Sequence, residues 1–229
     1  MTITRAVAVA IAFAASPAAN AADSSHPAVI ELFQSQGCSS CPPANANVNA
    51  LADRPDVLAL SFGVTYWDGL GWKDVFARPQ YTQRQWDYAR ALGNAQVWTP
   101  QVVVNGRATV TGTRRAALEA LVAEVDRGTG GPAIAFADGG VAITGTTPRP
   151  ADIWLVRYDP RTVAVAIKAG ENGGRTLPHR NIVHELIRIG SWTGGARRFA
   201  VPAARTPGLA TAVFVQAGAG GRIIAAVRG

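Results

Sequence analysis

The sequence is poor in several residue types, and each scarcity excludes a class of protein. Two cysteines cannot form the several disulfides that stabilise a small secreted scaffold. Met1 is the only methionine, so a mature chain offers no thioether ligand to a copper site. After residue 21 no apolar run is long enough to span a membrane. The remaining chain is long enough to bury a sizeable hydrophobic core.

Nucleic-acid motifs are also absent, although the chain carries a net charge of +7. Residues 1–130 hold ten basic and ten acidic residues, whereas residues 131–229 hold twelve basic and five acidic ones. The basic residues are scattered, and no basic patch interleaved with aromatic residues appears. We therefore expect no nucleic-acid partner, while an acidic partner for the basic second half stays open.

Residues 1–21 have the pattern of a secretory signal peptide. Arg5 supplies a positive charge, residues 6–15 are apolar but too few to span a bilayer, and Ala19-Asn20-Ala21 fits the cleavage pattern. We expect an exported protein, periplasmic or secreted, with no integral membrane segment after cleavage. In such an oxidising compartment a disulfide can persist.

The two cysteines, Cys38 and Cys41, are separated by two residues and lie between a predicted strand at 28–33 and a predicted helix at 42–54. Thioredoxin-like proteins place their redox pair at such a junction. Free N–H groups at a helix N-terminus stabilise a thiolate, which is the reactive form of cysteine. We predict thiol–disulfide exchange with protein or small-molecule thiols and disulfides, and we expect no cofactor. Cys38 is expected to be the attacking, more exposed sulfur and Cys41 the resolving one.

Four neighbours modify this prediction. Pro42 and Pro43 lack N–H groups, so the helix is expected to begin at Cys41 or Pro42. Fewer N–H donors then point at Cys38, and the hydroxyls of Ser39 and Ser40 can partly compensate.

Residues 22–130 read as one α/β unit of the βαβαββα type, which is thioredoxin-like. An apolar run at 57–62 predicts a buried parallel strand, and Asn105-Gly106 between two short β-rich runs predicts a hairpin. From residue 131 on, short strands alternate with turns, so residues 131–229 are expected to form a small antiparallel β-rich domain. This second domain, a sandwich or barrel, is expected to pack on the first.

Thr99-Pro100 precedes the predicted hairpin. In a thioredoxin-like fold this position holds a cis-proline facing the cysteines, and the preceding backbone docks an extended partner segment. We therefore predict a cis bond here and assign Thr99 and Pro100 to the site, with a proline at an ordinary strand start as the alternative.

The glycine-rich stretch from Gly170 to Arg175 contains a second group of candidate polar site residues. Glu171, Asn172 and Arg175 can line the cysteine cleft if this loop reaches the first domain. A carboxylate near the cysteines disfavours a thiolate and a guanidinium favours it. An ordinary loop held by an ion pair between Glu171 and Arg175 is the alternative.

Four motifs together resemble one known family. They are residues 31–44, which include the cysteines, residues 66–74, which include Trp67, residues 99–106 and residues 170–177. They are similar to the exported thioredoxin-like family catalogued as domain of unknown function 1223. The resemblance spans nearly the whole mature chain and implies a thioredoxin-like fold and export. It implies no established activity.

Two other functions stay open at this point. The disulfide can be purely structural, in a binding module without enzymatic activity. Alternatively, His179 and His184 can join Cys38 and Cys41 in a metal site, because two cysteines and two histidines form a common zinc ligand set. The two pairs are far apart in sequence, so we expect no metal.

Overall fold

The computed structural model describes residues 21–229, so nearly all of the expected signal peptide, residues 1–21, lies outside the described part. The first elements are β1 (Ala28–Gln34), α1 (Cys41–Leu51), β2 (Val57–Gly63), α2 (Pro79–Ala91), β3 (Gln101–Val104), β4 (Ala108–Val110) and α3 (Arg115–Glu124). The strands that follow are β5 (Ala133–Ala137), β6 (Gly140–Thr144), β7 (Ala151–Asp159), β8 (Val163–Ala166), β9 (Thr176–His179), β10 (Ile182–Trp192), β11 (Arg197–Ala200), β12 (Ala210–Gln216) and β13 (Ile223–Arg228). Among the described residues, no helix has the length and apolar character that crossing a membrane requires.

One mixed sheet of eight strands forms the centre of the molecule, in the order β13-β12-β7-β10-β2-β1-β3-β4. β1 and β2 are parallel, whereas β3 runs antiparallel to β1 and β4 antiparallel to β3. Every residue of β1 and β2 is buried. Their largely apolar sequences follow from this position, because central strands of such a sheet are covered on both faces.

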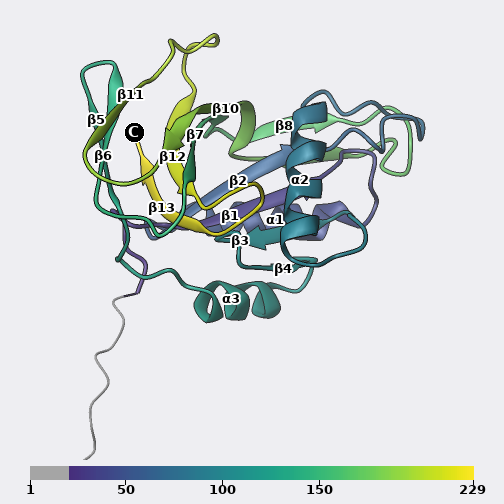
Figure 1. The fold of residues 1–229 in the computed structure, drawn as a ribbon. Coiled ribbons are helices and arrows are strands. Elements are labelled where there is room, and N and C mark those ends of the chain that lie inside the picture. The colour runs from purple at the N-terminus through teal and green to yellow at the C-terminus, as the bar shows by residue number, and fades with distance from the viewer. Residues whose placement is uncertain (1–20) are drawn as a thin grey trace, which may run out of the picture.

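The second half does not form the separate sandwich that the sequence suggests. β7, β10, β12 and β13 extend the first sheet, with β10 parallel to β2 where Ile182 pairs with Ser61. Without β10, β2 would present an open edge of unpaired backbone groups. β5, β6 and β11 form a second layer (Figure 1), and β8 and β9 form a separate two-stranded sheet. The second layer packs on the extension through residues such as Val141 and Val213. The chain is thus a mixed α/β protein with a large sheet and a small antiparallel β part. The division into domains at residue 130 stays a prediction.

Helices cover both faces of the first half of the sheet. α1 buries an apolar stripe, Ala44, Val48 and Leu51, and α3 adds Leu118 to the same core. α2 packs Tyr81 against the opposite face. The end of β1 and the start of α1 are therefore held rigidly between packed layers.

A buried ion pair fixes α2 to the sheet. Arg84 donates to both carboxylate oxygens of Glu31 on β1, at 2.6 and 3.0 Å, and to Gln216 on β12 at 3.1 Å. Tyr88 also donates to Glu31, and burial raises the pKa of the Tyr88 hydroxyl well above its ordinary value. All four side chains are buried, so the cluster links the first half of the chain to the extension of the sheet.

The predicted hairpin joins β3 to β4. Asn105 and Gly106 both have positive φ, 51° and 60°, which is the conformation of the type I′ turn that the Asn-Gly pair favours. A Cβ at Gly106 would lie 2.2 Å from the carbonyl oxygen of Gly221. Glycine is therefore required where this hairpin meets the turn between β12 and β13.

Candidate functional site

The two cysteines lie where β1 ends and α1 begins. Cys38 and Cys41 form a disulfide with their Cα atoms 5.5 Å apart. α1 starts at Cys41, as the prolines at 42 and 43 predict. Both cysteine residues have an exposed fraction of 0%. The prediction that Cys38 is the more exposed sulfur is therefore wrong, because other segments cover the disulfide.

Residues 170–175, which we call the covering loop, reach the cysteines. Asn172 is completely buried, and its Nδ2 donates to the carbonyl oxygens of Gln36 and Cys38, both at 2.9 Å. Arg175 donates to Asn172 Oδ1 at 2.6 Å. The side-chain amide of Asn172 thereby satisfies two buried carbonyls of the cysteine segment, which is a strong constraint on its conformation.

Glu171 forms the second link. Its carboxylate accepts a hydrogen bond from the backbone N–H of Ser39 at 2.9 Å, and hydrogen bonds with Ser39 lower the pKa of Glu171. Among the described residues no ion pair joins Glu171 to Arg175, so the alternative of a loop closed by that pair is wrong. Ser40 Oγ lies 3.3 Å from Cys38 Sγ, as expected of a hydroxyl beside the pair.

The two charges of the covering loop are placed differently. Glu171 sits against the backbone beside Cys38, where a carboxylate opposes the formation of a second negative charge. Arg175 is exposed and directs its guanidinium to Asn172. The hydrogen bonds of Asn172 thus connect the Arg175 guanidinium to the Cys38 backbone.

Sequence reasoning missed two side chains that hold Gln36. Trp72 Nε1 donates to Gln36 Oε1 at 2.9 Å, and Asp74 Oδ2 accepts from the Gln36 backbone N–H at 2.8 Å. Asp74 is buried, and burial raises the pKa of its carboxyl. The sequence did single out residues 66–74 as a motif. This segment forms no regular helix or strand, so its sequence has no periodicity from which the contacts with Gln36 can be predicted.

The covering loop and the segment after β2 meet at two glycines. A Cβ at Gly71 would lie 3.3 Å from the Cα of Gly170, and one at Gly170 would lie 3.1 Å from the Cβ of Trp72. Both glycines have positive φ, 100° and 72°. Larger residues at these positions would separate the two segments that cover the disulfide.

Trp67 links the cysteine segment to Thr99. Its Nε1 donates to Thr99 Oγ1 at 2.7 Å, while its Cβ lies near Gly37, the residue before Cys38. The Thr99–Pro100 peptide bond is cis, as predicted. Pro100 directly precedes β3, whose first residue pairs with Phe33 near the end of β1.

The predicted alternative of a metal site receives no support from the side-chain positions. His179 and His184 each lie edge-on to Phe76, with ring centroids 6.0 Å apart. Within residues 21–229, no group of three or more His, Cys, Asp or Glu residues is arranged to hold a metal ion. His179 is buried, both of its ring nitrogens lack partners there, and burial lowers its pKa to about 4.

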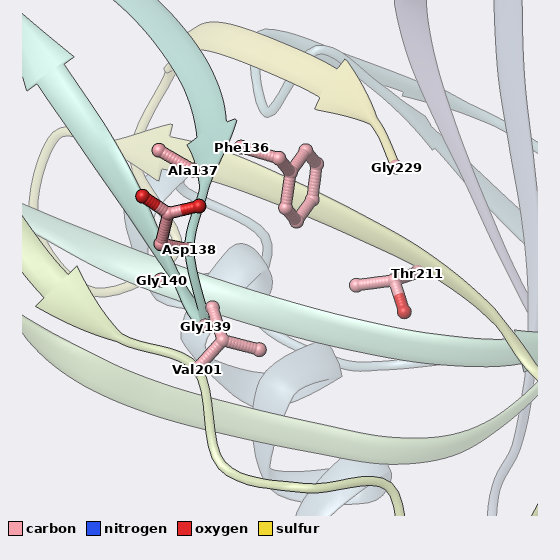
Figure 2. A pocket seen from close by; sticks show the side chains of 8 residues that line it. All are labelled: Phe136, Ala137, Asp138, Gly139, Gly140, Val201, Thr211 and Gly229. Carbon is pink, nitrogen blue, oxygen red and sulfur yellow. The ribbon is translucent and has the colours of Figure 1, made fainter.

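A separate hollow of about 480 Å³ lies in the second half, between the β5–β6 hairpin and the end of β13. Figure 2 shows the Phe136 ring between the hairpin and Thr211, with Val201 below. The residues that line the hollow include no cysteine, histidine or basic residue. It therefore contributes no group to redox chemistry at the disulfide.

Comparisons with known proteins agree with this architecture. The solved structure of AGR_C_4864 from Agrobacterium tumefaciens is 33% identical, with a TM-score of 0.69 over 88% of this chain and 92% of that one. HBP35 of Porphyromonas gingivalis is 15% identical, with a TM-score of 0.57 over 90% of this chain and 75% of that one, which is a likeness of fold alone. No curated protein matches the sequence.

The sequence also matches a family model. The match covers residues 29–216, which contain the cysteines, the proline before β3 and the covering loop. The four motifs that suggested this family all lie inside the matched region. The chain belongs to the family described as protein of unknown function (DUF1223).

Proposed function

We propose that this chain is an exported thioredoxin-like protein that carries out thiol–disulfide exchange through Cys38 and Cys41. The observation that carries the proposal is the position of the disulfide, between the end of β1 and the first turn of α1. Two residues separate the cysteines, so their sulfur atoms can reach bonding distance within one turn of the chain. A disulfide is also compatible with an oxidising compartment outside the cytoplasm.

The arrangement of the first half supports the thioredoxin-like part of the proposal. Its strands have the order β2-β1-β3-β4, with α1 and α3 packed on one face and α2 on the other. In that fold the redox pair precedes the first helix. The backbone at Thr99 and Pro100, beside Trp67, is the place at which an extended partner segment docks.

The exchange proceeds in two displacements. In the reduced protein the Cys38 thiolate attacks a partner disulfide, so that a Cys38–partner bond forms and the partner's other sulfur leaves as a thiolate. Cys41, as a thiolate, then attacks Cys38 Sγ, which closes the intramolecular disulfide and releases the second partner thiolate. Two electrons pass from the cysteines to the partner, and the reverse sequence oxidises a partner dithiol.

Access to the sulfurs requires a local movement. Both cysteines are fully buried in the oxidised form, and the covering loop is fixed to their segment by Asn172 and Glu171. Opening of this loop exposes the disulfide without unfolding the sheet, because few side-chain hydrogen bonds hold the loop to the cysteine segment.

Complete burial also favours a second function, a binding module with a structural disulfide. A buried disulfide held by surrounding hydrogen bonds can serve only to fix the start of α1. Fold alone does not distinguish the two functions. Direct capture of an exchange partner distinguishes catalytic exchange from a structural disulfide.

The test is trapping with a Cys41→Ser variant, which forms the mixed disulfide at Cys38 but cannot resolve it. The purified variant is incubated with an exported-protein extract and with glutathione disulfide, and adducts are identified by mass mapping. We expect adducts that a reductant releases and that a Cys38→Ser variant forms far more slowly. Absence of adducts, or equal adducts on both variants, would support the structural disulfide.

A further inference from the structure

A cleft of about 220 Å³ opens between α1 and β9, near the start of α1 at Cys41. Pro42, which follows Cys41, begins one wall, and Arg175 of the covering loop begins the other. α1 and β9 are joined further along by a hydrogen bond from Asn49 Nδ2 to the carbonyl oxygen of Pro178. The cleft therefore starts at the cysteine segment and is closed at its far end.

The lining combines apolar surface with two polar groups. Pro42, Leu177 and Pro178 supply the apolar part. Asn45 is only 5% exposed, and its Oδ1 has no hydrogen-bond partner among the described residues, although its Nδ2 donates to Gln34 at 3.4 Å. This acceptor is covered from solvent, so a ligand N–H reaches it after a small outward movement of the cleft wall and then supplies the partner that it lacks.

Arg175 provides the complementary charge. Its guanidinium donates through Nη1 to Asn172 Oδ1, and the residue is exposed, so a carboxylate in the cleft can compete with Asn172 for the guanidinium. The volume lies below the usual range of about 300–1,000 Å³ for drug-sized ligands. It suits a molecule of amino-acid size.

We propose that this cleft binds the amino-acid end of a low-molecular-weight thiol, with its carboxylate on Arg175 and its amino N–H on Asn45 Oδ1. The inference rests on the proposed function and names a substrate class for it. The thiol group of such a ligand extends past Pro42 toward the disulfide. Two ligand molecules reduce the protein: the first forms a mixed disulfide and releases one cysteine thiolate, and the second displaces the first as a disulfide.

Binding and access are coupled through Arg175. A carboxylate is a stronger acceptor for a guanidinium than an amide oxygen is. The ligand therefore draws Arg175 away from Asn172, and Asn172 is the residue that holds the covering loop to Cys38. The thiol that occupies the cleft thus loosens the cover over the bond it attacks.

The test compares four thiols that differ in two groups. Cysteine carries both the carboxylate and the ammonium, cysteamine lacks the carboxylate, and N-acetylcysteine and N-acetylcysteamine repeat the comparison without the free amine. Rates of reduction of the folded, oxidised protein are divided by each thiol's rate with a small model disulfide. We expect the carboxylate to raise the corrected rate about tenfold, the effect of roughly 1.4 kcal/mol of added binding.

Two variants test whether the preference belongs to the cleft. Ala46→Phe places a ring in the cleft from an exposed position of α1. Ala50→Phe, one turn further along the same helix, is the matched control because Ala50 is exposed and does not line the cleft. We expect Ala46→Phe to abolish the carboxylate preference and Ala50→Phe to retain it.

The outcomes separate this inference from the proposed function. Equal corrected rates for all four thiols, or a preference that survives Ala46→Phe, would overturn the cleft site while leaving thiol–disulfide exchange intact. A disulfide that none of the thiols, nor dithiothreitol, reduces in the folded protein would overturn both proposals.

Discussion

Replacing Asn172 with alanine is expected to uncover the disulfide. The side chain donates two hydrogen bonds of 2.9 Å to buried carbonyls, one of them that of Cys38, and accepts one from Arg175. Alanine removes all three and leaves the two carbonyls without a partner until the loop opens to water. The folded sheet does not depend on these bonds, so the effect is concentrated in the covering loop.

The magnitude follows from the number of bonds lost. A hydrogen bond contributes about 1 kcal/mol net, so the two to the cysteine segment amount to about 2 kcal/mol. If the closed loop loses that free energy relative to the open one, the open fraction rises roughly thirtyfold, since about 1.4 kcal/mol is tenfold. Reduction through the open form accelerates by the same factor.

The assay is the rate of reduction by dithiothreitol, with the free energy of unfolding measured in urea alongside. Asn47→Ala is the matched control, because Asn47 Nδ2 also donates twice, to the carbonyl oxygens of Gly112 and Thr113 at 2.8 and 3.1 Å, away from the cysteines. We expect faster reduction only in Asn172→Ala. An unchanged rate, or equal acceleration in the control, would refute the role of the covering loop.

Three further perturbations test other parts of the structure. Hydrogen bonds with Ser39 lower the pKa of Glu171, so the contact between Glu171 and Ser39 should weaken as the pH falls through that lowered pKa, below 4.5. Reduction of the disulfide by a phosphine should then become faster in the wild-type protein but not in Glu171→Gln. Burial lowers the pKa of His179 to about 4, so the unfolded chain binds the extra proton first. As the pH is lowered from 6.5 to 4, the free energy of unfolding measured in urea should fall by about 1.4 kcal/mol per pH unit. His179→Phe should remove this pH dependence. Glu31→Leu should destabilise the fold by about 3–5 kcal/mol because it strands the Arg84 charge, and the double variant with Arg84→Met should recover most of that loss. No recovery in the double variant would show that packing, not the stranded charge, sets the cost.

Local patterns predicted the local elements well. The run at 57–62, the predicted helix at 42–54 and the Asn105-Gly106 turn each correspond to an element found in the structure. In these cases the periodicity of burial and the φ preference of single residues decide the conformation. The start of α1 at Cys41 followed in the same way from the missing N–H groups of Pro42 and Pro43.

Contacts between distant segments were harder to predict. Nothing in the sequence of β10 indicates that Ile182 pairs with Ser61, so the shared sheet was read as a separate sandwich. The polarity of residues 170–175 suggested a contact with the cysteines, but burial of both sulfurs was missed. Burial depends on Trp72 and Gly170 meeting across about a hundred residues of chain, a relation that no local pattern contains.

The reduction potential of the Cys38–Cys41 disulfide tests the central claim most directly. It is measured by equilibrating the folded protein with dithiothreitol or glutathione buffers and counting free thiols. Catalytic exchange predicts a potential above about −300 mV, in the range of known oxidoreductases. A value well below about −300 mV would contradict the claim and identify the disulfide as a structural bond.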